Sequence, residues 1–281
     1  MGAPTDGSET MTVSQTDLDA FWRDGAVVLR GALAPEWVQL LADGIDANMA
    51  NPSERAVDYT PEGNTGRYFG DYCNWRDVPE FDQFVRESPA AALAAQITRS
   101  KRQVRFFHEH VLVKEPGTSE KTPWHHDLPY YIVSGRQVCS LWIPVDPVPV
   151  EAAVQFVAGS HEGPLYLPRK FSDGRNYEYV PDGYEQVPDI DAELAADAEA
   201  HQIVSWAMEP GDVLAFHMQT LHASDGTEEG GHRRRAFAAR FLGDDAVFAT
   251  RPGTPSPPYP HVEFIAGEPV DHPEFPVVWA R

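Results

Sequence analysis

The run VRFFHEHVLVK at residues 104–114 marks the point where the chain changes from helical to β-type sequence. It is rich in β-branched and aromatic residues, and a Pro-Gly pair at residues 116–117 follows it, which is typical of a strand that ends in a turn. Similar short apolar runs, separated by turn residues, follow further along the chain. We predict strands at residues 104–114, 138–144, 153–157, 213–216 and 236–242.

The sequence that precedes this run favours helices. Ser14 is a suitable N-cap for a first helix, because its hydroxyl can accept from the first turn and apolar residues follow at helical spacing. Residues 51–77 mix turn residues with aromatics and are predicted to form a long loop that acts as a functional lid. We predict helices at residues 15–23, from Pro35 onward and at residues 90–97, with a buried strand at residues 26–29.

Helices followed by strands predict an α+β chain, mainly β, built on an antiparallel sheet that closes into a sandwich or barrel. The 281 residues contain no internal repeat and no clear linker, so we expect one domain over residues 1–281. Its expected parts are a flexible N-terminus (residues 1–13), a helical part (14–100), a β core (101–250) that contains a Pro-, Gly- and acid-rich insertion (164–207), and a proline-rich tail (251–281).

The composition is that of an acidic globular protein. Lys and Arg number 22 against 43 Asp and Glu, a formal net charge of -21. This charge repels nucleic-acid backbones and anionic lipids, and the one dense basic run, residues 232–235, is too short to suggest nucleic acid. Two cysteines without metal-type spacing, no secretory pattern at residues 1–13 and no long apolar run predict a cytoplasmic protein without a membrane partner. The oligomeric state is left open.

The segment TPWHHDLPYY at residues 122–131 carries the clearest chemical signal. His125 and Asp127 are two residues apart, so in an extended segment both side chains point to one side, where they can share a metal ion. A third ligand should come from another strand, and His222, just after the apolar run at residues 213–216, is the best placed. Two histidines and one carboxylate form the facial set that holds iron and leaves three positions open.

A cation is predicted near this cluster. Arg234 opens an apolar strand, and a guanidinium at the start of a buried strand needs an anion such as the distal carboxylate of 2-oxoglutarate. Its neighbours Arg233 and Arg235 are interpreted as solvated residues paired with acids. We prefer His222 over His217 as the distal ligand, because His217 lies within the apolar strand and its spacing to Arg234 is wrong.

Five motifs resemble, in order and rough spacing, those of the phytanoyl-CoA dioxygenase family of iron(II)/2-oxoglutarate oxygenases. The segment DAFWRDGAVVL at residues 19–29 also looks like the opening helix and strand of that family. The resemblance covers nearly the whole chain except the proline-rich tail. The five motifs are WHHD (124–127), GSH (159–161), PGDV (210–213), HAS (222–224) and RRA (234–236).

The resemblance implies a double-stranded β-helix, a jelly-roll similar to that of cupins, with N-terminal helices packed on one sheet. It implies that iron(II) is held by His125, Asp127 and His222, and that dioxygen and 2-oxoglutarate are cosubstrates. Family members that halogenate have a small residue in place of the metal carboxylate, so Asp127 implies hydroxylation or another oxidation. The residues implied to line the 2-oxoglutarate site are Arg234, Ser224, Lys114 and Trp142.

Substrate recognition is less defined by the sequence. His110 shares strand parity with His108 and Lys114, so it is a candidate to face the same cavity, with an ordinary structural histidine as the alternative. We expect a small free metabolite or natural-product intermediate, because an acidic chain is a poor cradle for an acyl-CoA thioester, the alternative substrate within the same class. Further candidates for the pocket are Gln155, Arg67 and Tyr68, with Trp124 and Tyr130 as candidate walls near the iron.

Two other functions fit the cluster alone. His-x-Asp with a distant histidine also binds zinc, so a zinc hydrolase is one alternative. It lacks a further ligand cluster or a Gly-x-Ser-x-Gly nucleophile motif in this sequence. The other alternative is a non-catalytic barrel that binds a small molecule, which predicts no oxygen uptake.

Overall fold

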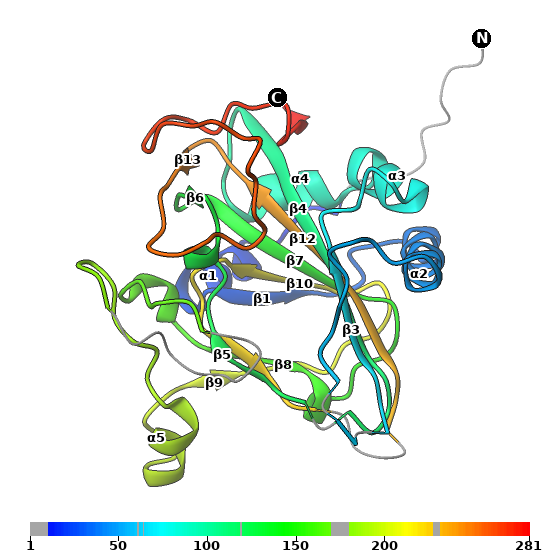
Figure 1. Cartoon of the computed structure of the whole chain (residues 1–281), viewed down its shortest axis with the longest axis vertical. Helices are drawn as coiled ribbons and strands as arrows, with labels where there is room; N and C mark the ends of the chain where they lie inside the picture. The colour runs from blue at the N-terminus through cyan, green and yellow to red at the C-terminus, as the bar shows by residue number, and fades with distance from the viewer. Residues whose placement is uncertain (1–10, 61, 64, 119, 170–179, 227–230) are drawn as a thin grey trace.

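The computed structural model describes residues 11–60, 62–63, 65–118, 120–169, 180–226 and 231–281. Two antiparallel sheets form its centre (Figure 1), as the sequence predicts. The large sheet has the order β1 (Ala26–Leu29), β10 (Val213–His217), β7 (Val138–Pro144), β12 (Arg234–Leu242), β4 (Gln103–Lys114), β3 (Tyr68–Tyr72) and β2 (Val57–Asp58), and β14 (Val277–Ala280) also pairs with β4. The small sheet has the order β5 (Thr122–His125), β11 (His222–Ser224), β8 (Val154–Val157) and β9 (Ile203–Val204).

Helices pack on the large sheet and beside the small one. Helices α1 to α4 share a hydrophobic core with the large sheet, and α5 lies beside β9 of the small sheet (Figure 1). The α-helices are α1 (Gln15–Asp24), α2 (Pro35–Ala50), α3 (Pro79–Glu87), α4 (Ala90–Ile97) and α5 (Ile190–Ala196). Short elements complete the described fold: the pair β13 (Val247–Phe248) with β6 (Val133–Ser134), and single 3-10 turns at Leu128–Tyr130, Val150–Ala152 and Ser160–Glu162.

The alternation of side chains along the large sheet separates the core from the functional pocket. On β12, Phe237 and Ala239 pack against the helices, whereas Ala236 and Ala238 belong to the cluster between the two sheets. The ring of Phe237 lies 4.8 Å from that of Phe81 in α3, measured between centroids. A one-residue slip of β12 would therefore exchange its core and pocket residues.

Most predicted elements are observed close to their predicted bounds. The helix at residues 90–97 and the strands at residues 26–29 and 138–144 match, and α1 ends one residue later than predicted. The N-cap is also observed, because the hydroxyl of Ser14 accepts from the N–H of Asp17 at 3.1 Å.

Two segments differ from the sequence prediction. Residues 51–77, predicted as a loop, contain β2 and β3, because β3 pairs with β4, a strand far along the chain that local sequence does not reveal. The tail at residues 251–281 likewise contributes β14 to β4. Helix α3 was not predicted.

The ends and the insertion are described only in part. Of the N-terminus predicted to be flexible, residues 1–10 lie outside the described residues, whereas Val13 is buried and its N–H donates to the side chain of Gln96 at 2.9 Å. Of the insertion at residues 164–207, residues 170–179 lie outside the described residues. No helix in the described parts of the chain is long and apolar enough to cross a membrane.

Two glycines with left-handed backbone allow a matched test of packing at the end of α1. Gly25 has φ +82°, and a Cβ there would lie 2.5 Å from the Thr220 hydroxyl oxygen, whereas Gly31 has φ +57° and no atom within 4 Å of such a Cβ. Gly31→Ala should cost about 1–2 kcal/mol of unfolding free energy through backbone strain alone. Gly25→Ala adds the clash and should cost roughly 1–3 kcal/mol more. Urea unfolding measures both, and equal losses would contradict this account.

Candidate active site

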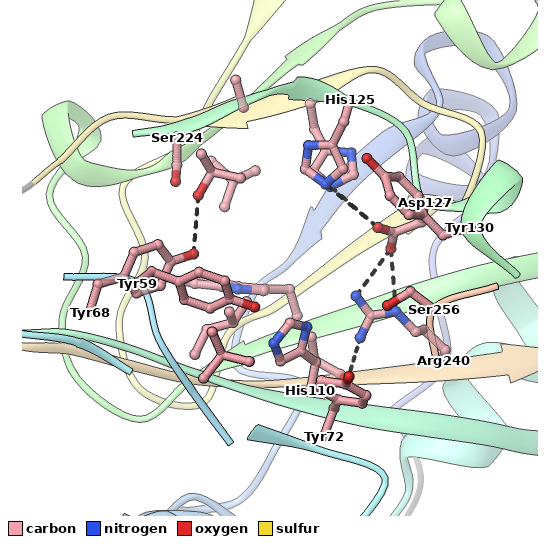
Figure 2. Close-up of a pocket in the computed structure, with 18 of the residues that line it drawn as sticks. Tyr59, Tyr68, Tyr72, His110, His125, Asp127, Tyr130, Ser224, Arg240 and Ser256 are labelled. Carbon is pink, nitrogen blue, oxygen red and sulfur yellow. Dashed lines mark hydrogen bonds and ion pairs between the residues drawn. The ribbon is translucent and has the colours of Figure 1, made fainter. Parts of the chain in front are cut away.

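A cavity of about 290 Å³ lies between the two sheets. Side chains of the large sheet, of the small sheet and of residues 256–257 line it, and Figure 2 shows how they converge. The cluster of two histidines and one aspartate is at one end of the cavity. Arg234, Lys114 and Ser224 gather at the other end.

Strand pairing brings the two histidines of the cluster together. His125 on β5 is the direct partner of His222 on β11, and their ring centroids are 4.1 Å apart. Asp127 follows β5, and its Oδ1 lies 3.7 Å from Nε2 of His125 and 3.9 Å from Nε2 of His222. One donor atom from each residue lies within 4.8 Å of the others, so the three can hold one metal ion.

The histidines are oriented and neutral. The Nδ1–H of His125 donates to the carbonyl of Pro123 at 2.8 Å, and that of His222 donates to the carbonyl of Thr220 at 2.9 Å. Nε2 of each ring therefore carries the lone pair and faces Asp127. Burial, with the neighbouring His222, lowers the pKa of His125 to about 3, and burial also lowers the pKa of His222.

Asp127 is an ionised carboxylate in a buried place. Burial alone would raise its pKa, but Arg240 and the two histidines, with a hydrogen bond from Ser140, together hold the pKa well below its usual value. Nε and Nη2 of Arg240 donate to Oδ2 at 3.3 and 3.2 Å, and the Ser140 hydroxyl lies 3.2 Å from the same oxygen (Figure 2 draws the Arg240 contacts). Oδ1 is thus the oxygen that faces the histidines. Two neutral imidazoles and one carboxylate fit a ferrous ion.

The other end of the cavity is cationic. The guanidinium of Arg234 donates to the carbonyl of Ala152 and to the hydroxyl of Ser224, the latter at 3.4 Å. Lys114 is fully buried, and its Nζ lies 3.3 Å from the Ser224 hydroxyl. Burial and the nearby charge of Arg234 lower the pKa of Lys114 to about 6. Among the described residues, neither cation forms an ion pair with a carboxylate, so the pair is suited to an anion from solution.

Aromatic side chains complete this cationic end. The ring of Tyr68 lies 4.7 Å from Nζ of Lys114, and the ring of Trp142 lies 5.8 Å from the guanidinium carbon of Arg234. The hydroxyl of Tyr68 is hydrogen-bonded to that of Thr122 at 3.2 Å.

The predicted site residues separate into two groups in the structure. His125, Asp127, His222, Arg234, Ser224, Trp142, His110, Tyr68 and Tyr130 all line the cavity, and Lys114 is buried behind the lining residue Ser224, whose hydroxyl lies 3.3 Å from its Nζ. Gln155 and Arg67 do not line it, because Gln155 bonds to Asp225 at 3.1 Å and Arg67 pairs with Asp58 at 2.9 Å.

Two other residues considered from the sequence, the candidate wall Trp124 and the rejected metal ligand His217, lie outside the cavity lining. Trp124 lies on the side of the small sheet that faces α5, where its Nε1–H donates to Asp191 at 2.8 Å. Nε2 of His217 instead lies 3.1 Å from the carbonyl of Arg136, which agrees with the preference for His222.

Several lining residues were missed by sequence reasoning. Arg240 and Ser140 contact Asp127, and strand parity could have found them, since Arg240 has the parity of Arg234 on β12 and Ser140 that of Trp142 on β7. Tyr59 and Tyr72 come from the segment interpreted as a loop, so no strand parity was assigned to them.

Comparison with known proteins places this site in a family. A family model described as phytanoyl-CoA dioxygenase matches residues 21–236, which is most of the chain. The chain belongs to the phytanoyl-CoA dioxygenase family. The family predicted from the motifs is thereby confirmed.

A curated relative in the phytanoyl-CoA dioxygenase family comes from Caenorhabditis elegans. Described as "Probable phytanoyl-CoA dioxygenase", it is 24% identical over 218 residues, which are 75% of this chain and 63% of that protein. The match thus spans less than two thirds of the length of that relative.

Solved structures share the fold of this phytanoyl-CoA dioxygenase family member. The epimerase SnoN, in complex with Fe3+, alpha ketoglutarate and nogalamycin RO, has a TM-score of 0.72 and 19% identity over 94% of this chain and 98% of that one. The carbocyclase SnoK has a TM-score of 0.70 and 20% identity over 95% of this chain and 97% of that one. EctD from S. alaskensis, solved with 2-oxoglutarate and 5-hydroxyectoine, has a TM-score of 0.67 and 19% identity over 95% of this chain and 90% of that one. These likenesses confirm the predicted jelly-roll core.

The ion pair between Arg240 and Asp127 should be important for stability. Both side chains are about 6–7% exposed, so Arg240→Met leaves a buried charge without its partner and should cost about 3–5 kcal/mol of unfolding free energy. Arg136→Met is the matched control, because the pair of Arg136 with Glu162 is exposed and should contribute less than about 1 kcal/mol. Urea unfolding of the metal-free variants measures both. Similar small losses would show that the buried pair does not stabilise the fold.

Buried histidines predict a loss of stability in mild acid. Burial lowers the pKa of His110 and of His217 to about 3, and that of His108 well below its ordinary value. In the unfolded chain these imidazoles bind protons near pH 6.5, so the unfolded state gains protons as the pH falls from about 6.5 toward 3. Each of these histidines should lower the free energy of unfolding by up to about 1.4 kcal/mol for each pH unit of acidification in that window. Glu109 has the opposite effect, because burial raises its pKa to about 7 and the folded state therefore binds one more proton there than the unfolded state does in mild acid.

Unfolding in urea at pH values between about 7.5 and 5 measures this slope, without added metal. His217→Phe should reduce the slope of unfolding free energy against pH by the equivalent of about one proton. His217 is suitable for this test because it lies away from the cavity lining. Stability that rises as the pH falls through this window would refute the assignment of neutral buried histidines.

Proposed function

We propose that this chain is an iron(II)- and 2-oxoglutarate-dependent dioxygenase that hydroxylates a C–H bond of a small metabolite or natural-product intermediate, releasing succinate and CO2. The observation that carries the proposal is that one cavity is lined by both the His-Asp-His cluster and Arg234, with Lys114 buried beside Ser224, and that neither of these two basic side chains has a carboxylate partner among the described residues. The first group suits a ferrous ion, and the second suits a dicarboxylate.

His125, Asp127 and His222 are the proposed iron ligands. When bound, iron(II) and 2-oxoglutarate supply the oxidising chemistry, in which dioxygen is consumed and 2-oxoglutarate becomes succinate and CO2 as a substrate C–H bond is oxidised. The protein keeps both imidazoles neutral and the carboxylate ionised. Arg240 and Ser140 hold Oδ2 of Asp127, so the carboxylate presents Oδ1 to the metal position.

Arg234 is proposed to bind one carboxylate of 2-oxoglutarate, with Ser224 and Lys114 beside it. A carboxylate there would receive charge-assisted hydrogen bonds from two cations that are already desolvated. It would also favour the protonated form of Lys114, whose pKa is lowered while Arg234 is its nearest charged neighbour. Trp142 and Tyr68 cover these groups and exclude water.

A small-molecule substrate is supported by two observations. The cavity is small, and the neighbours SnoN and EctD have been solved with nogalamycin RO and 5-hydroxyectoine. An acyl-CoA thioester is the second candidate, favoured by the description of the Caenorhabditis elegans relative. It is opposed by the net charge of -21.

The test is anaerobic reconstitution with iron(II) and 2-oxoglutarate, followed by admission of oxygen in the presence of candidate substrates. Succinate formation that depends on oxygen and is stimulated by a free metabolite supports the proposal, whereas stimulation only by acyl-CoA supports the second candidate. Zinc-dependent hydrolysis without succinate would indicate a zinc hydrolase. Binding without oxygen uptake would indicate a non-catalytic barrel.

Substitution of the proposed ligands should separate metal from cosubstrate. His125→Ala or Asp127→Ala should lower succinate formation at least about a hundredfold by removing a metal ligand. Arg234→Ala should raise the KM for 2-oxoglutarate about 10- to 100-fold while iron remains bound, because it removes charge-assisted hydrogen bonds.

Arg233→Ala is the matched control for Arg234, since Arg233 pairs with Glu115 at the surface and does not line the cavity. Its KM for 2-oxoglutarate should equal that of the wild type. Full turnover by Asp127→Ala would exclude the assigned ligand set.

A further inference from the structure

The large-sheet side of the cavity forms a subsite that the proposed chemistry does not use. His108 and His110 project from β4 toward the cavity, next to Tyr72 on β3 and Tyr59 beyond β2. In Figure 2, His110 lies between Tyr59 and Arg240, across the cavity from the metal cluster. These residues therefore form the part of the cavity lining opposite the metal position.

Two buried nitrogens in this subsite have no hydrogen-bond partner among the described residues. They are Nε2 of His110 and Nδ1 of His108. An unsatisfied buried polar atom costs about 1–3 kcal/mol, so such atoms in a cavity point to a ligand group that completes them.

Gly70 allows the two rings of this subsite to approach each other closely. A Cβ on Gly70 would lie 3.1 Å from Nε2 of His110 and 2.8 Å from the ring of Tyr59, so a larger residue would displace them. The rings of Tyr59 and Tyr72 line the cavity beside His110, and their faces favour contact with a flat or cyclic group.

The subsite carries no unbalanced charge. Burial lowers the pKa of His110 to about 3 and raises the pKa of Tyr59 and of Tyr72, so all three side chains are neutral near pH 7. Arg240 and Asp127, the two charged lining residues nearest this subsite in Figure 2, are paired with each other at 3.2 Å. An ionised ligand group here would lose its hydration without gaining a counter-charge.

Apart from the paired Asp127 and Arg240, the charged residues that line the cavity lie around the cationic end. Nζ of Lys114 bonds to the carbonyl of Glu120 at 2.9 Å, and Lys121 pairs with Asp225 at 2.7 Å. The cavity therefore separates a region that suits an anion from a region that suits a neutral polar group.

We propose that the substrate is an uncharged cyclic molecule whose hydroxyl or carbonyl group hydrogen-bonds to Nε2 of His110, with its ring against the side chains of Tyr59 and Tyr72 that line the cavity. This inference rests on the proposed function, because it names the substrate class of the same site. It makes His110 a specificity-determining residue, and it excludes carboxylate, phosphate and ammonium groups from this subsite.

Three probes with the same bicyclic ring test the charge preference: 2-naphthol, 2-naphthoate and 2-naphthylmethylammonium. Binding is measured by calorimetry on the full chain loaded with Zn²⁺ and 2-oxoglutarate, which prevents turnover. We expect 2-naphthol to bind at least about tenfold more tightly than either charged probe, since a buried unpaired charge is costly. Equal or tighter binding of a charged probe would overturn the proposal.

Variants test the role of His110. His110→Phe should weaken 2-naphthol binding about 5- to 10-fold through the lost hydrogen bond, and His110→Asn should recover part of it. Gly70→Ala should also weaken binding, because its Cβ would displace the ring of Tyr59 and the imidazole of His110. His261→Phe is the control, because His261 is exposed and outside the cavity lining. Unchanged 2-naphthol affinity in both His110→Phe and Gly70→Ala would refute the subsite.

The affinity for 2-oxoglutarate separates this inference from the proposed function. His110→Phe should bind 2-oxoglutarate as the wild type does, since His110 has no contact with Arg234 or Lys114 among the described residues. Normal 2-oxoglutarate binding without a preference for 2-naphthol would refute the substrate class and leave the oxygenase proposal standing. A wild-type chain that does not bind 2-oxoglutarate would refute the oxygenase proposal itself.

Discussion

The buried carboxylate of Asp127 is the constraint on which the rest of the site depends. It is nearly inaccessible to water, yet it stays ionised because a buried guanidinium, a hydroxyl and two imidazoles surround it. Each partner comes from a different strand: Arg240 from β12, Ser140 from β7, His125 from β5 and His222 from β11. Both sheets must therefore be in register before the charge is compensated, so the site forms only in the folded protein.

The same alternation of side chains builds the core and the cavity from the large sheet. Odd-numbered residues of β12 pack on the helices, while Arg234, Ala238 and Arg240 line the cavity. The aromatic residues of β12, Phe237 and Phe241, thus lie on the core face, and the opposite face of this strand can hold charged groups without weakening the core. The helices matter to the site because they bury the first face and so determine which face remains for the second.

The charge of the cavity lining differs in sign from the net charge of the chain. The protein carries a net charge of -21, but the end around Arg234 and Lys114 is cationic, and the side around His110 is neutral. A dicarboxylate and an uncharged substrate can then occupy adjacent places without competing for the same groups. Surface acidity says little about such a cavity, because burial separates it from the solvent-exposed acids.

The sequence by itself determined the family and the main strands and helices, and it supplied the proposed metal and cosubstrate residues, because short motifs such as HHD and RRA and strand parity depend on neighbours along the chain. The tertiary structure decided what depends on distant partners. It made β3 a strand by pairing it with β4, brought Arg240 to Asp127, and moved Gln155 and Arg67 away from the cavity. Hydrogen bonds between strands and the compensation of a buried charge are made across the fold, so no local pattern encodes them.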